Sequence, residues 1–309
     1  MKLSIISSAF NEAEVLPHFL SRSENICNLL VQEGPVTNYE IVIVDDGSTD
    51  DTWKILQENH TRNSLIKGLK FSRNFGQHSS ILAGLDHADG DFVVFLDPDL
   101  QAQPEDIPKL LQESFRGYDM VWGVARERRD NLLVKGGSKL FYWMFNKIAG
   151  VKVPREPVIA CASRRAVNYI TKLREARQFS LAQWVYVGFK TSYVMVDKKE
   201  RIKGKMKYSL LRRANLAVVG IVGFSKLPLK ISNFLGFIMS FVGLALGCYM
   251  IGRKLLLGIA VPGYASIIAS IMFFFGLQFL ILGIMGEYIG IIIDEVKGRP
   301  VYILEEILK

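Results

Sequence analysis

The sequence has few of the residues that build metal-bound or disulfide-bonded frameworks. Its three cysteines, Cys27, Cys161 and Cys248, form no CxxC pair, which excludes a disulfide framework and a zinc site of ordinary spacing. The four histidines show neither HExxH nor zinc-finger spacing. No nucleic-acid-binding motif is present, so we expect no nucleic-acid partner. The net charge of +8 gathers toward the C-terminal end and suits anionic lipid headgroups or an anionic lipid substrate.

Charge is absent from two long stretches in the last third of the chain. Residues 231–252 and 255–286 contain no acidic or basic residue, and each exceeds the ~20 residues that a helix needs to cross a bilayer. We therefore predict a two-span transmembrane hairpin over 230–290. Its second helix should start near Tyr264, because Pro262-Gly263 breaks the apolar run. A buried pair of core helices is the alternative, but uncharged runs of this length are rare in soluble domains.

Basic residues flank the two spans unevenly. The basic residues that precede the first span are Lys203, Lys205, Lys207, Arg212, Arg213, Lys226 and Lys230. Those that follow the second span are Lys297, Arg299 and Lys309. Between the spans lie only Arg253 and Lys254. The positive-inside rule then places both termini in the cytoplasm. The first apolar run ends already at Ser7, which is too short for a cleavable signal peptide. We expect a multi-pass protein of the inner cell membrane with its N-terminal two-thirds in the cytoplasm.

Apolar strand-like runs alternate with helical segments over the first hundred residues. Strands are predicted at 2–7, 39–44, 65–71 and 92–96, and helices from Asn11 as N-cap to about 33, at 51–59 and at about 73–85. This alternation predicts an α/β fold with a doubly wound, mostly parallel sheet and helices on both faces. Ligands of such sheets bind outside the carboxyl ends of the strands.

Acidic side chains follow the predicted strands at that edge. The strand at 92–96 ends in Asp97-Pro98-Asp99, and Gln101 adds an amide oxygen two residues on. Two carboxylates and an amide this close can hold a hard divalent cation such as Mg²⁺. Glu12 and Asp46 follow the first and second strands. A solvated turn is the alternative for a lone Asp-x-Asp, but its place at the end of a buried strand favours a metal and phosphate site.

Several short motifs occur in a fixed order along the chain. They are Ser8-Ala-Phe-Asn-Glu12, Val44-Asp-Asp-Gly-Ser-Thr-Asp50, Ser72-Arg-Asn-Phe-Gly76, Asp97-Pro-Asp-Leu-Gln101, Arg201-Ile-Lys-Gly-Lys-Met-Lys-Tyr208, and Gly286-Glu-Tyr-Ile-Gly290 followed by Arg299-Pro300 and Tyr302. Through them nearly the whole chain resembles the inverting family 2 glycosyltransferases of GT-A fold. Within that family it is most similar to the polyprenyl-phosphate group, such as bactoprenol glucosyltransferases and dolichyl-phosphate mannose synthase. Each motif is weak alone, whereas their order makes the resemblance specific.

The resemblance implies transfer of a sugar from a nucleotide diphosphate sugar to a polyprenyl phosphate, with inversion, at the cytoplasmic membrane face. A UDP-sugar is the favoured donor and GDP-mannose the other candidate; the acceptor is undecaprenyl or dolichyl phosphate. The product would serve cell-envelope glycan modification and would need a lipid-sugar flippase. Mg²⁺ or Mn²⁺ is the implied cofactor.

The implied organisation has four parts. A cytoplasmic GT-A domain covers 1–209, an interfacial amphipathic segment 210–229, the hairpin 230–290 and a cytoplasmic tail 291–309. Small residues such as Gly243, Ala245 and Gly247 permit close helix packing and hence a homo-oligomer, with a tetramer as one candidate.

The family's site residues carry over to matching positions. The nucleotide sugar would contact Ser8, Phe10, Glu12, Val44, Asp46, Asp97, Pro98, Asp99, Gln101 and Arg126. The metal would bind Asp97, Asp99 and Gln101. The acceptor phosphate would contact Arg126, Arg129, Lys135, Arg201 and Lys207. The catalytic set would be Asp99, Arg126, Arg201 and Lys207. For Phe10 and Val44 plain core packing is an equal alternative, and for the basic loop at 126–135 a solvated charge run is the usual explanation.

Val158 stands where relatives often carry an aspartate regarded as a candidate base. A lipid phosphate has a second pKa near ~6 and is largely a dianion at neutral pH, so it needs placement more than a base. A scaffold that binds nucleotide sugar without catalysis is one alternative function. A processive polysaccharide synthase is a second alternative function. It is disfavoured because Gln183-Trp184 does not reproduce the Gln-x-x-Arg-Trp signature of such enzymes. Two spans are also too few to enclose a channel.

Overall fold

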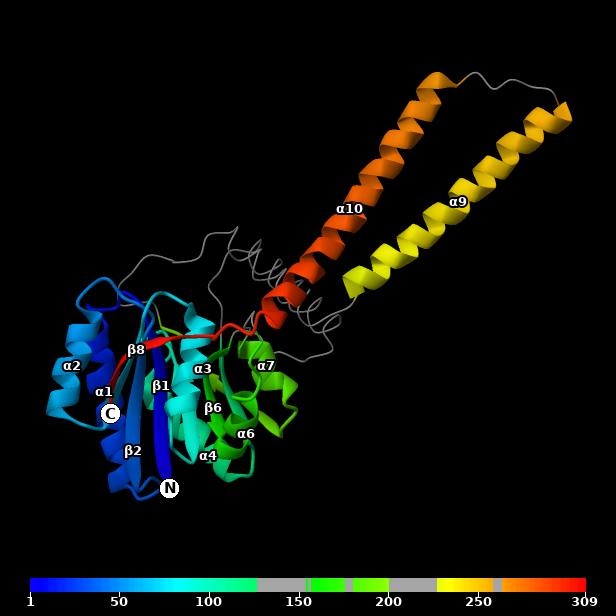
Figure 1. Cartoon of the computed structure of the whole chain (residues 1–309). Coiled ribbons are helices and arrows are strands. Elements are labelled where there is room, and N and C mark those ends of the chain that lie inside the picture. The colour runs from blue at the N-terminus through cyan, green and yellow to red at the C-terminus, as the bar shows by residue number, and fades with distance from the viewer. Residues whose placement is uncertain (127–153, 155–156, 176–179, 200–226, 258–262) are drawn as a thin grey trace.

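The computed structural model describes residues 1–126, 154, 157–175, 180–199, 227–257 and 263–309, which form an α/β domain and two long helices that project from it (Figure 1). The strands are β1 Lys2–Ala9, β2 Asn38–Asp45, β3 Ile66–Phe71, β4 Phe92–Leu96, β5 Met120–Ala125, β6 Pro157–Ser163, β7 Thr191–Val196 and β8 Leu304–Leu308. They make an 8-stranded sheet in the order β7-β5-β6-β4-β1-β2-β3-β8.

Helices cover both faces of this sheet. They are α1 Leu16–Gln32, α2 Thr52–Arg62, α3 Gln77–His87, the 3-10 turn η1 Pro104–Asp106, α4 Ile107–Phe115, α6 Arg164–Ile170, α7 Ser180–Tyr186, α9 Leu227–Leu257 and α10 Tyr264–Val296. Side chains of α1, α2 and α4 fill the core on one face, and those of α3, α6 and α7 fill it on the other. The predicted doubly wound α/β fold is confirmed.

The strand directions place most loops that follow a strand at one edge. β1 pairs in parallel with both β2 and β4, and β2 pairs in parallel with β3. β6 and β8 run antiparallel to their neighbours, so the sheet is mixed but mostly parallel. The carboxyl ends of β1 to β5 therefore share one edge, together with the beginning of β6.

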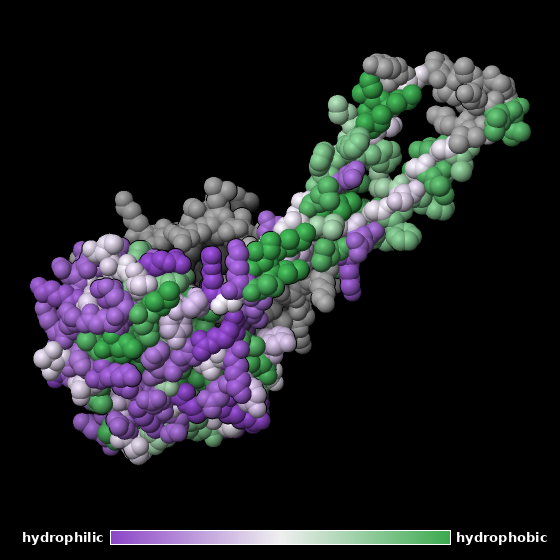
Figure 2. Space-filling view, in the orientation of Figure 1, coloured by the Kyte–Doolittle hydropathy of each residue, from purple (hydrophilic) through white to green (hydrophobic). Residues whose placement is uncertain are grey.

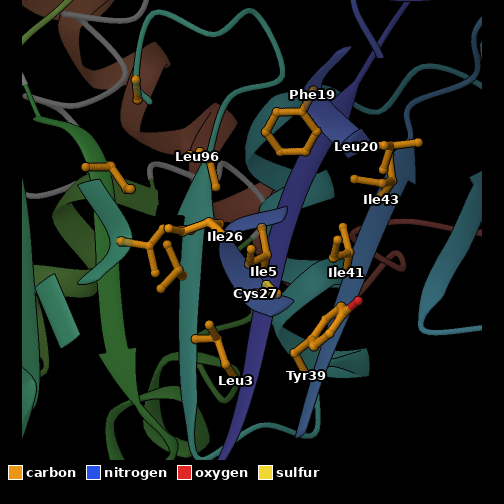
Figure 3. Packing of buried hydrophobic residues seen from close by; sticks show 14 of the residues in the cluster. Leu3, Ile5, Phe19, Leu20, Ile26, Cys27, Tyr39, Ile41, Ile43 and Leu96 are labelled. Atoms are coloured by element: carbon orange, nitrogen blue, oxygen red, sulfur yellow. The ribbon is translucent and has the colours of Figure 1, made fainter. Parts of the chain in front are cut away.

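The core beneath this edge is built by the alternation of side chains along the central strands. On one face, Leu3 and Ile5 of β1 and Ile41 of β2 meet Phe19 and Leu20 of α1 (Figure 3). All of these side chains are fully buried. Burial of each contributes roughly 1.5–3 kcal/mol, and the packed face holds the central strands in register.

The first helix starts later than its sequence suggests. The prediction that Asn11 is its N-cap is wrong, because α1 begins at Leu16 with Pro17 in its first turn, where the missing proline N–H costs nothing. Asn11 has a left-handed backbone with φ 54°, which asparagine tolerates better than most residues. Its Oδ1 instead accepts the N–H of Thr49 at 2.8 Å and so joins the loops after β1 and β2.

The two long helices match the predicted spans and are almost wholly exposed. The stretches Leu227–Tyr249 and Ser270–Val296 are long and apolar enough to cross a membrane, with 6% and 0% of their most apolar segments buried. A pair of core helices would be buried, so that alternative fails; Figure 2 shows the apolar residues along both helices. α10 begins at Tyr264, as the Pro262-Gly263 break predicts. Residues 227–229 of the expected interfacial segment belong to α9, and 210–226 lie outside the described residues.

The tail after α10 returns to the sheet instead of ending in solvent. The chain turns at Gly298, whose φ of 55° suits glycine, and β8 then pairs antiparallel with β3. The Ser72 N–H donates to the Ile303 carbonyl at 3.0 Å, and Trp53 Nε1 donates to Glu306 at 2.9 Å. The tail thereby covers the β3 edge, which would otherwise expose unpaired backbone groups.

One aromatic residue anchors the start of this tail. The ring of Tyr302 stacks on Phe71 with 5.3 Å between ring centroids and 12° between planes. Its hydroxyl donates to Asp86 Oδ2 at 2.7 Å, and the same carboxylate forms an ion pair with Arg174 at 2.8 Å. Burial and the nearby Asp86 carboxylate raise the pKa of Tyr302, so the phenol stays a hydrogen-bond donor.

We expect Tyr302→Ala to lower the free energy of unfolding of the α/β domain by about 3 kcal/mol, because both the stacked ring and the hydrogen bond are lost. Tyr302→Phe keeps the ring and should cost about 1 kcal/mol. Thermal or denaturant unfolding of the detergent-solubilised chain measures both. Equal stabilities of wild type and Tyr302→Ala would show that the tail is not docked on β3.

A buried carboxylate, that of Glu40, lies near the amino-terminal ends of the central strands, opposite their carboxyl edge. Glu40 is 1% exposed and contacts Lys2 Nζ at 2.8 Å and Lys67 Nζ at 2.7 Å. It also accepts the Ser4 hydroxyl at 2.5 Å and the Asp89 N–H at 2.6 Å. Burial alone would raise the pKa of Glu40, but these donors outweigh it and lower the pKa from 4.5 to about 2.

Because the folded-state pKa of Glu40 is depressed, its contribution to stability is present above pH 4.5 and is lost as pH falls toward about 2. We expect Glu40→Gln to lower stability at neutral pH and to flatten the decline of stability over this acid range. Denaturant midpoints measured across the range test this, with the exposed acid variant Glu33→Gln as control. Parallel pH profiles for wild type and Glu40→Gln would contradict it.

Candidate active site

The carboxyl edge of the sheet carries an unusual concentration of left-handed backbone. In the described part of the chain, the non-glycine residues with positive φ are Asn11 at 54° and Leu100 at 58°, and both lie at this edge. Gly47 and Gly76, at the same edge, have φ of 70° and 97°. Strained backbone of this kind persists only where the surroundings enforce it, and it clusters at functional sites. The edge is therefore the candidate site on backbone grounds alone.

Asp46 joins the loops after β2 and β3. Its carboxylate is 3% exposed, with Oδ1 accepting the Phe75 N–H at 2.7 Å and Oδ2 the Gly76 N–H at 3.0 Å. Burial raises the pKa of Asp46, and the two N–H donors oppose that rise. The neighbouring Gly47 is required here, because a Cβ would lie 2.6 Å from the Arg73 carbonyl carbon. The two loops therefore form one packed unit.

Asp45 is a buried acid that the sequence analysis did not single out. It is 0% exposed, and its Oδ1 accepts the Ser48 N–H at 2.9 Å. Its Oδ2 has no hydrogen-bond partner among the described residues. Burial raises its pKa, with the hydrogen bonds of Ser48 acting against the rise. Two adjacent acids at the end of β2 thus point to opposite faces of the sheet, and only Asp46 meets the β3 loop.

The acidic turn after β4 is the most polar element of the edge. Asp97 Oδ1 accepts from Gln77 Nε2 at 2.7 Å, which connects the turn to the start of α3. Asp99 is 8% exposed, and its Oδ1 accepts the Gln101 N–H at 3.0 Å around the left-handed Leu100. The Gln101 carbonyl in turn accepts the Lys199 N–H at 3.1 Å from the segment after β7. Neighbouring loops thus position the turn from both sides.

The donor set of this turn fits a hard divalent cation. No group of three or more His, Cys, Asp or Glu residues gathers within the described part of the chain. Mg²⁺ usually binds proteins through one or two carboxylates and completes its shell with waters and substrate phosphates. Asp97, Asp99 and Gln101 supply two carboxylates and an amide oxygen, which suits that mode and Mn²⁺ as well.

A cavity of about 210 Å³ opens beside the acidic turn. β4 and β6 pair Leu96 with Ile159, so Val158 stands across from Asp97, and both line the cavity. Asp97 is the one carboxylate among its described lining residues. Trp184 closes the far wall at 3% exposure, and its Nε1 has no hydrogen-bond partner among the described residues.

His78 also lines this cavity and is neutral. Burial lowers its pKa to about 4, and its Nδ1 lies 3.2 Å from the Ser180 hydroxyl. Gln77, His78 and Trp184 were not predicted as site residues. They come from α3 and α7, which are far apart in sequence. The only sequence signal near Gln77 is its proximity to the Ser-Arg-Asn-Phe-Gly and Asp-x-Asp motifs.

The remaining predicted nucleotide residues lie at the ends of β1 and β2 and in the acidic turn. Ser8 pairs with Val44, and Val44 is fully buried in the core on the α3 face. Phe10 and Glu12 are half-buried in the loop after β1, and Pro98 is buried inside the turn. Val44 thus packs in the core, the alternative that the sequence left open.

Of the predicted basic residues, the structure describes only Arg126. It follows β5 at the same edge, is exposed, and its Nε lies 3.7 Å from Asp197 Oδ1. The backbone N–H of Arg126 donates to the Val196 carbonyl at 3.0 Å. Arg129, Lys135, Arg201 and Lys207 lie outside the described residues.

A doubly wound sheet with an acidic turn after β4 and nested loops after β1, β2 and β3 has its ligand-binding edge at the carboxyl ends of its strands. Residues 4–193 match the model of Glycosyl transferase family 2, and the chain belongs to that family. It is a glycosyltransferase with two candidate membrane-spanning helices at its C-terminal end.

Curated relatives align over almost the full chain. The chain is 36% identical to the prophage bactoprenol glucosyl transferase homolog of Escherichia coli K12, covering 100% of both chains. It is 34% identical to the undecaprenyl-phosphate 4-deoxy-4-formamido-L-arabinose transferase of Proteus mirabilis, covering 99% of this chain and 94% of that one.

Among solved structures, glucosyl-3-phosphoglycerate synthase from Mycobacterium tuberculosis, in complex with Mn²⁺, UDP and phosphoglyceric acid, has the same fold. It superposes with a TM-score of 0.51 at 19% identity, covering 72% of this chain and 76% of that one. The predicted GT-A fold is thereby confirmed.

We expect Asp46→Ala to free the amides of Phe75 and Gly76, because both lose their acceptor. Their hydrogen exchange should accelerate by about tenfold or more, which corresponds to the loss of one to two hydrogen bonds. Hydrogen-exchange mass spectrometry over residues 72–80 measures this. Asp51→Ala, at an exposed acid of the same edge, is the control; unchanged exchange in Asp46→Ala would refute the role of Asp46 in holding the loop.

Proposed function

We propose that the chain transfers a sugar, with inversion, from a nucleotide diphosphate sugar to a polyprenyl phosphate at the cytoplasmic face of a membrane. One observation carries this proposal: the site edge of the sheet, with its acidic turn, faces the same side of the domain as the bases of α9 and α10 (Figure 1). A lipid phosphate held at the bilayer surface could thus approach a donor bound at that edge. The printed names of the relatives support the same acceptor class.

The nucleotide is assigned to the loops after β1 and β2. Phe10 offers a ring for stacking on the base, and Glu12 and Asp46 offer carboxylates to a base edge or to ribose hydroxyls. UDP is the favoured nucleotide, since the bactoprenol relatives are glucosyl transferases and the structural neighbour was solved with UDP. GDP-mannose is the second candidate donor.

The donor's diphosphate is assigned to the acidic turn. Asp97, Asp99 and Gln101 would hold Mg²⁺ or Mn²⁺, which when bound neutralises the charge that builds on the leaving nucleotide. The sugar then extends into the 210 Å³ cavity next to Asp97. There Phe95, Trp122 and Trp184 form an aromatic wall that excludes water.

The acceptor phosphate needs placement rather than a base. Val158 lies beside Asp97 and offers no proton acceptor, and burial keeps His78 neutral. A phosphate monoester is already largely a dianion at neutral pH, with a second pKa near ~6. Arg126, Arg129, Lys135, Arg201 and Lys207 are the proposed contacts that hold it in line behind the anomeric carbon.

The proposal includes a membrane arrangement. α9 and α10 cross the inner membrane, both termini lie in the cytoplasm, and the lipid-linked product passes to a flippase for use in the cell envelope. Gly243 and Gly247 lie exposed on α9, with nothing within 4 Å of an added Cβ, which supports close packing against a second copy.

The deciding experiment incubates membranes containing the chain with labelled UDP- and GDP-sugars and polyprenyl phosphate, and then counts label in the extracted lipid. We expect transfer by the wild type, which carries valine at 158, and a loss of at least ~100-fold in Asp99→Ala. Chelation should stop transfer, and Mg²⁺ or Mn²⁺ should restore it.

Glu58→Ala, at an exposed acid of α2, is the matched control and should retain full activity. The proposal fails if the wild type transfers no sugar from any donor. It also fails if Asp99→Ala is as active as the wild type. Donor binding without transfer would instead identify the scaffold alternative.

A further inference from the structure

A second cavity lies between the loop after β3 and the end of α10. Its volume is about 390 Å³, and its charged lining residues are Arg73 from the loop, and Asp294, Lys297 and Arg299 from α10 and the turn after it. We propose that this cavity binds the phosphate-bearing headgroup of an anionic membrane phospholipid, at a place separate from the reacting acceptor. This goes beyond the proposed transfer reaction, because it concerns a lipid that is not consumed.

The charge of the lining favours an anion. Three cationic side chains face one carboxylate, and all three cations are exposed. None of the ion pairs in the described part of the chain involves Arg73, Lys297 or Arg299. The Arg73 guanidinium lies 4.1 Å from the centre of the Phe75 ring, and its Nη1 donates to the Asn74 carbonyl at 3.3 Å. Arginine and lysine arranged this way bind phosphate through charge-assisted hydrogen bonds.

The position of the cavity matches the level of lipid headgroups. The candidate span of α10 runs to Val296, with Glu287, Asp294 and Glu295 in its last three turns, and Lys297 follows at once. Lysine and arginine directly beyond a spanning helix lie in the headgroup layer, where anionic lipids concentrate. The cavity therefore opens where phospholipid phosphates are abundant, whereas a soluble anion would have to compete with them.

The cavity and the reaction site have different lining residues. Asp97 and Asp99 of the acidic turn are not among the described residues that line this cavity, although Gly76 and Ser79 in its wall flank Gln77 and His78 of the cavity beside Asp97. The occupant is therefore assigned as a bystander lipid, and competition with polyprenyl phosphate distinguishes it from the acceptor.

Occupancy of the cavity would act on the donor site through one loop. The segment that supplies Arg73 also supplies the Phe75 and Gly76 N–H groups that hold Asp46. A headgroup bound between this loop and Lys297 or Arg299 would bridge the sheet to the membrane helix. Contact with an anionic bilayer would thereby steady the loop that orients Asp46.

The test is a titration of the detergent-solubilised full chain with short-chain phosphatidylglycerol, followed by calorimetry. We expect saturable binding that weakens with salt, little binding of short-chain phosphatidylcholine, and little binding of inorganic phosphate. Arg73→Gln and Arg299→Gln should each weaken phosphatidylglycerol binding by about tenfold. Lys54→Gln, which removes an exposed charge from α2, should bind as the wild type does.

Several outcomes would overturn the proposal. If phosphatidylglycerol binds no more tightly than phosphatidylcholine, the proposed site does not exist. The same follows if phosphatidylglycerol binding is unchanged in both variants. Inorganic phosphate bound as tightly as the lipid makes it a free-anion site instead. Polyprenyl phosphate that displaces phosphatidylglycerol and loses affinity in the same variants makes it the acceptor site. Arg299 lies on an exposed turn, so its variant keeps the test valid even if Arg73→Gln unfolds, and binding is measured without sugar transfer.

Discussion

The antiparallel pairing of β8 with β3 holds the membrane helices and the site edge in a fixed relation. α10 leads through a short turn into β8, and Tyr302 locks that turn by stacking on Phe71 and donating to Asp86. Without this return, the second helix would be tethered to the domain by an unpaired tail. With it, the end of α10 is joined to the domain by hydrogen bonds within one sheet.

The site itself depends on carboxylates that bind the protein's own backbone. Asp46 holds two peptide N–H groups of the β3 loop, Asp99 holds the Gln101 N–H, and Asp97 holds the Gln77 amide. These contacts fix the loops before any ligand arrives, which reduces the ordering cost of binding. They also enforce the left-handed backbone at Leu100, a conformation that an isolated leucine would avoid. The loops of this edge are thus ordered by contacts within the protein.

The surroundings of the cavity beside Asp97 are consistent with an acceptor that needs no deprotonation. Valine stands at position 158, burial lowers the pKa of His78 to about 4 so that its imidazole is only a weak base, and Asp97 is the one carboxylate among the described lining residues. An alcohol acceptor would be poorly served by such a wall. A phosphate dianion already carries its nucleophilic oxygen, so in-line placement suffices.

Much of this protein follows from the sequence alone. The alternation of apolar runs with helical segments predicted the first four strands and the doubly wound sheet. The lack of charge predicted both long helices, and the ordered motifs predicted the family, because each of these depends on local pattern. Only the tertiary structure showed that Asn11 joins two loops instead of capping α1, that the tail becomes β8, and that Val44 is core. It also brought Gln77 and Trp184 to Asp97 and set Arg73 opposite Arg299. These relations join residues far apart in the chain, and no local pattern encodes which distant partners a fold brings into contact.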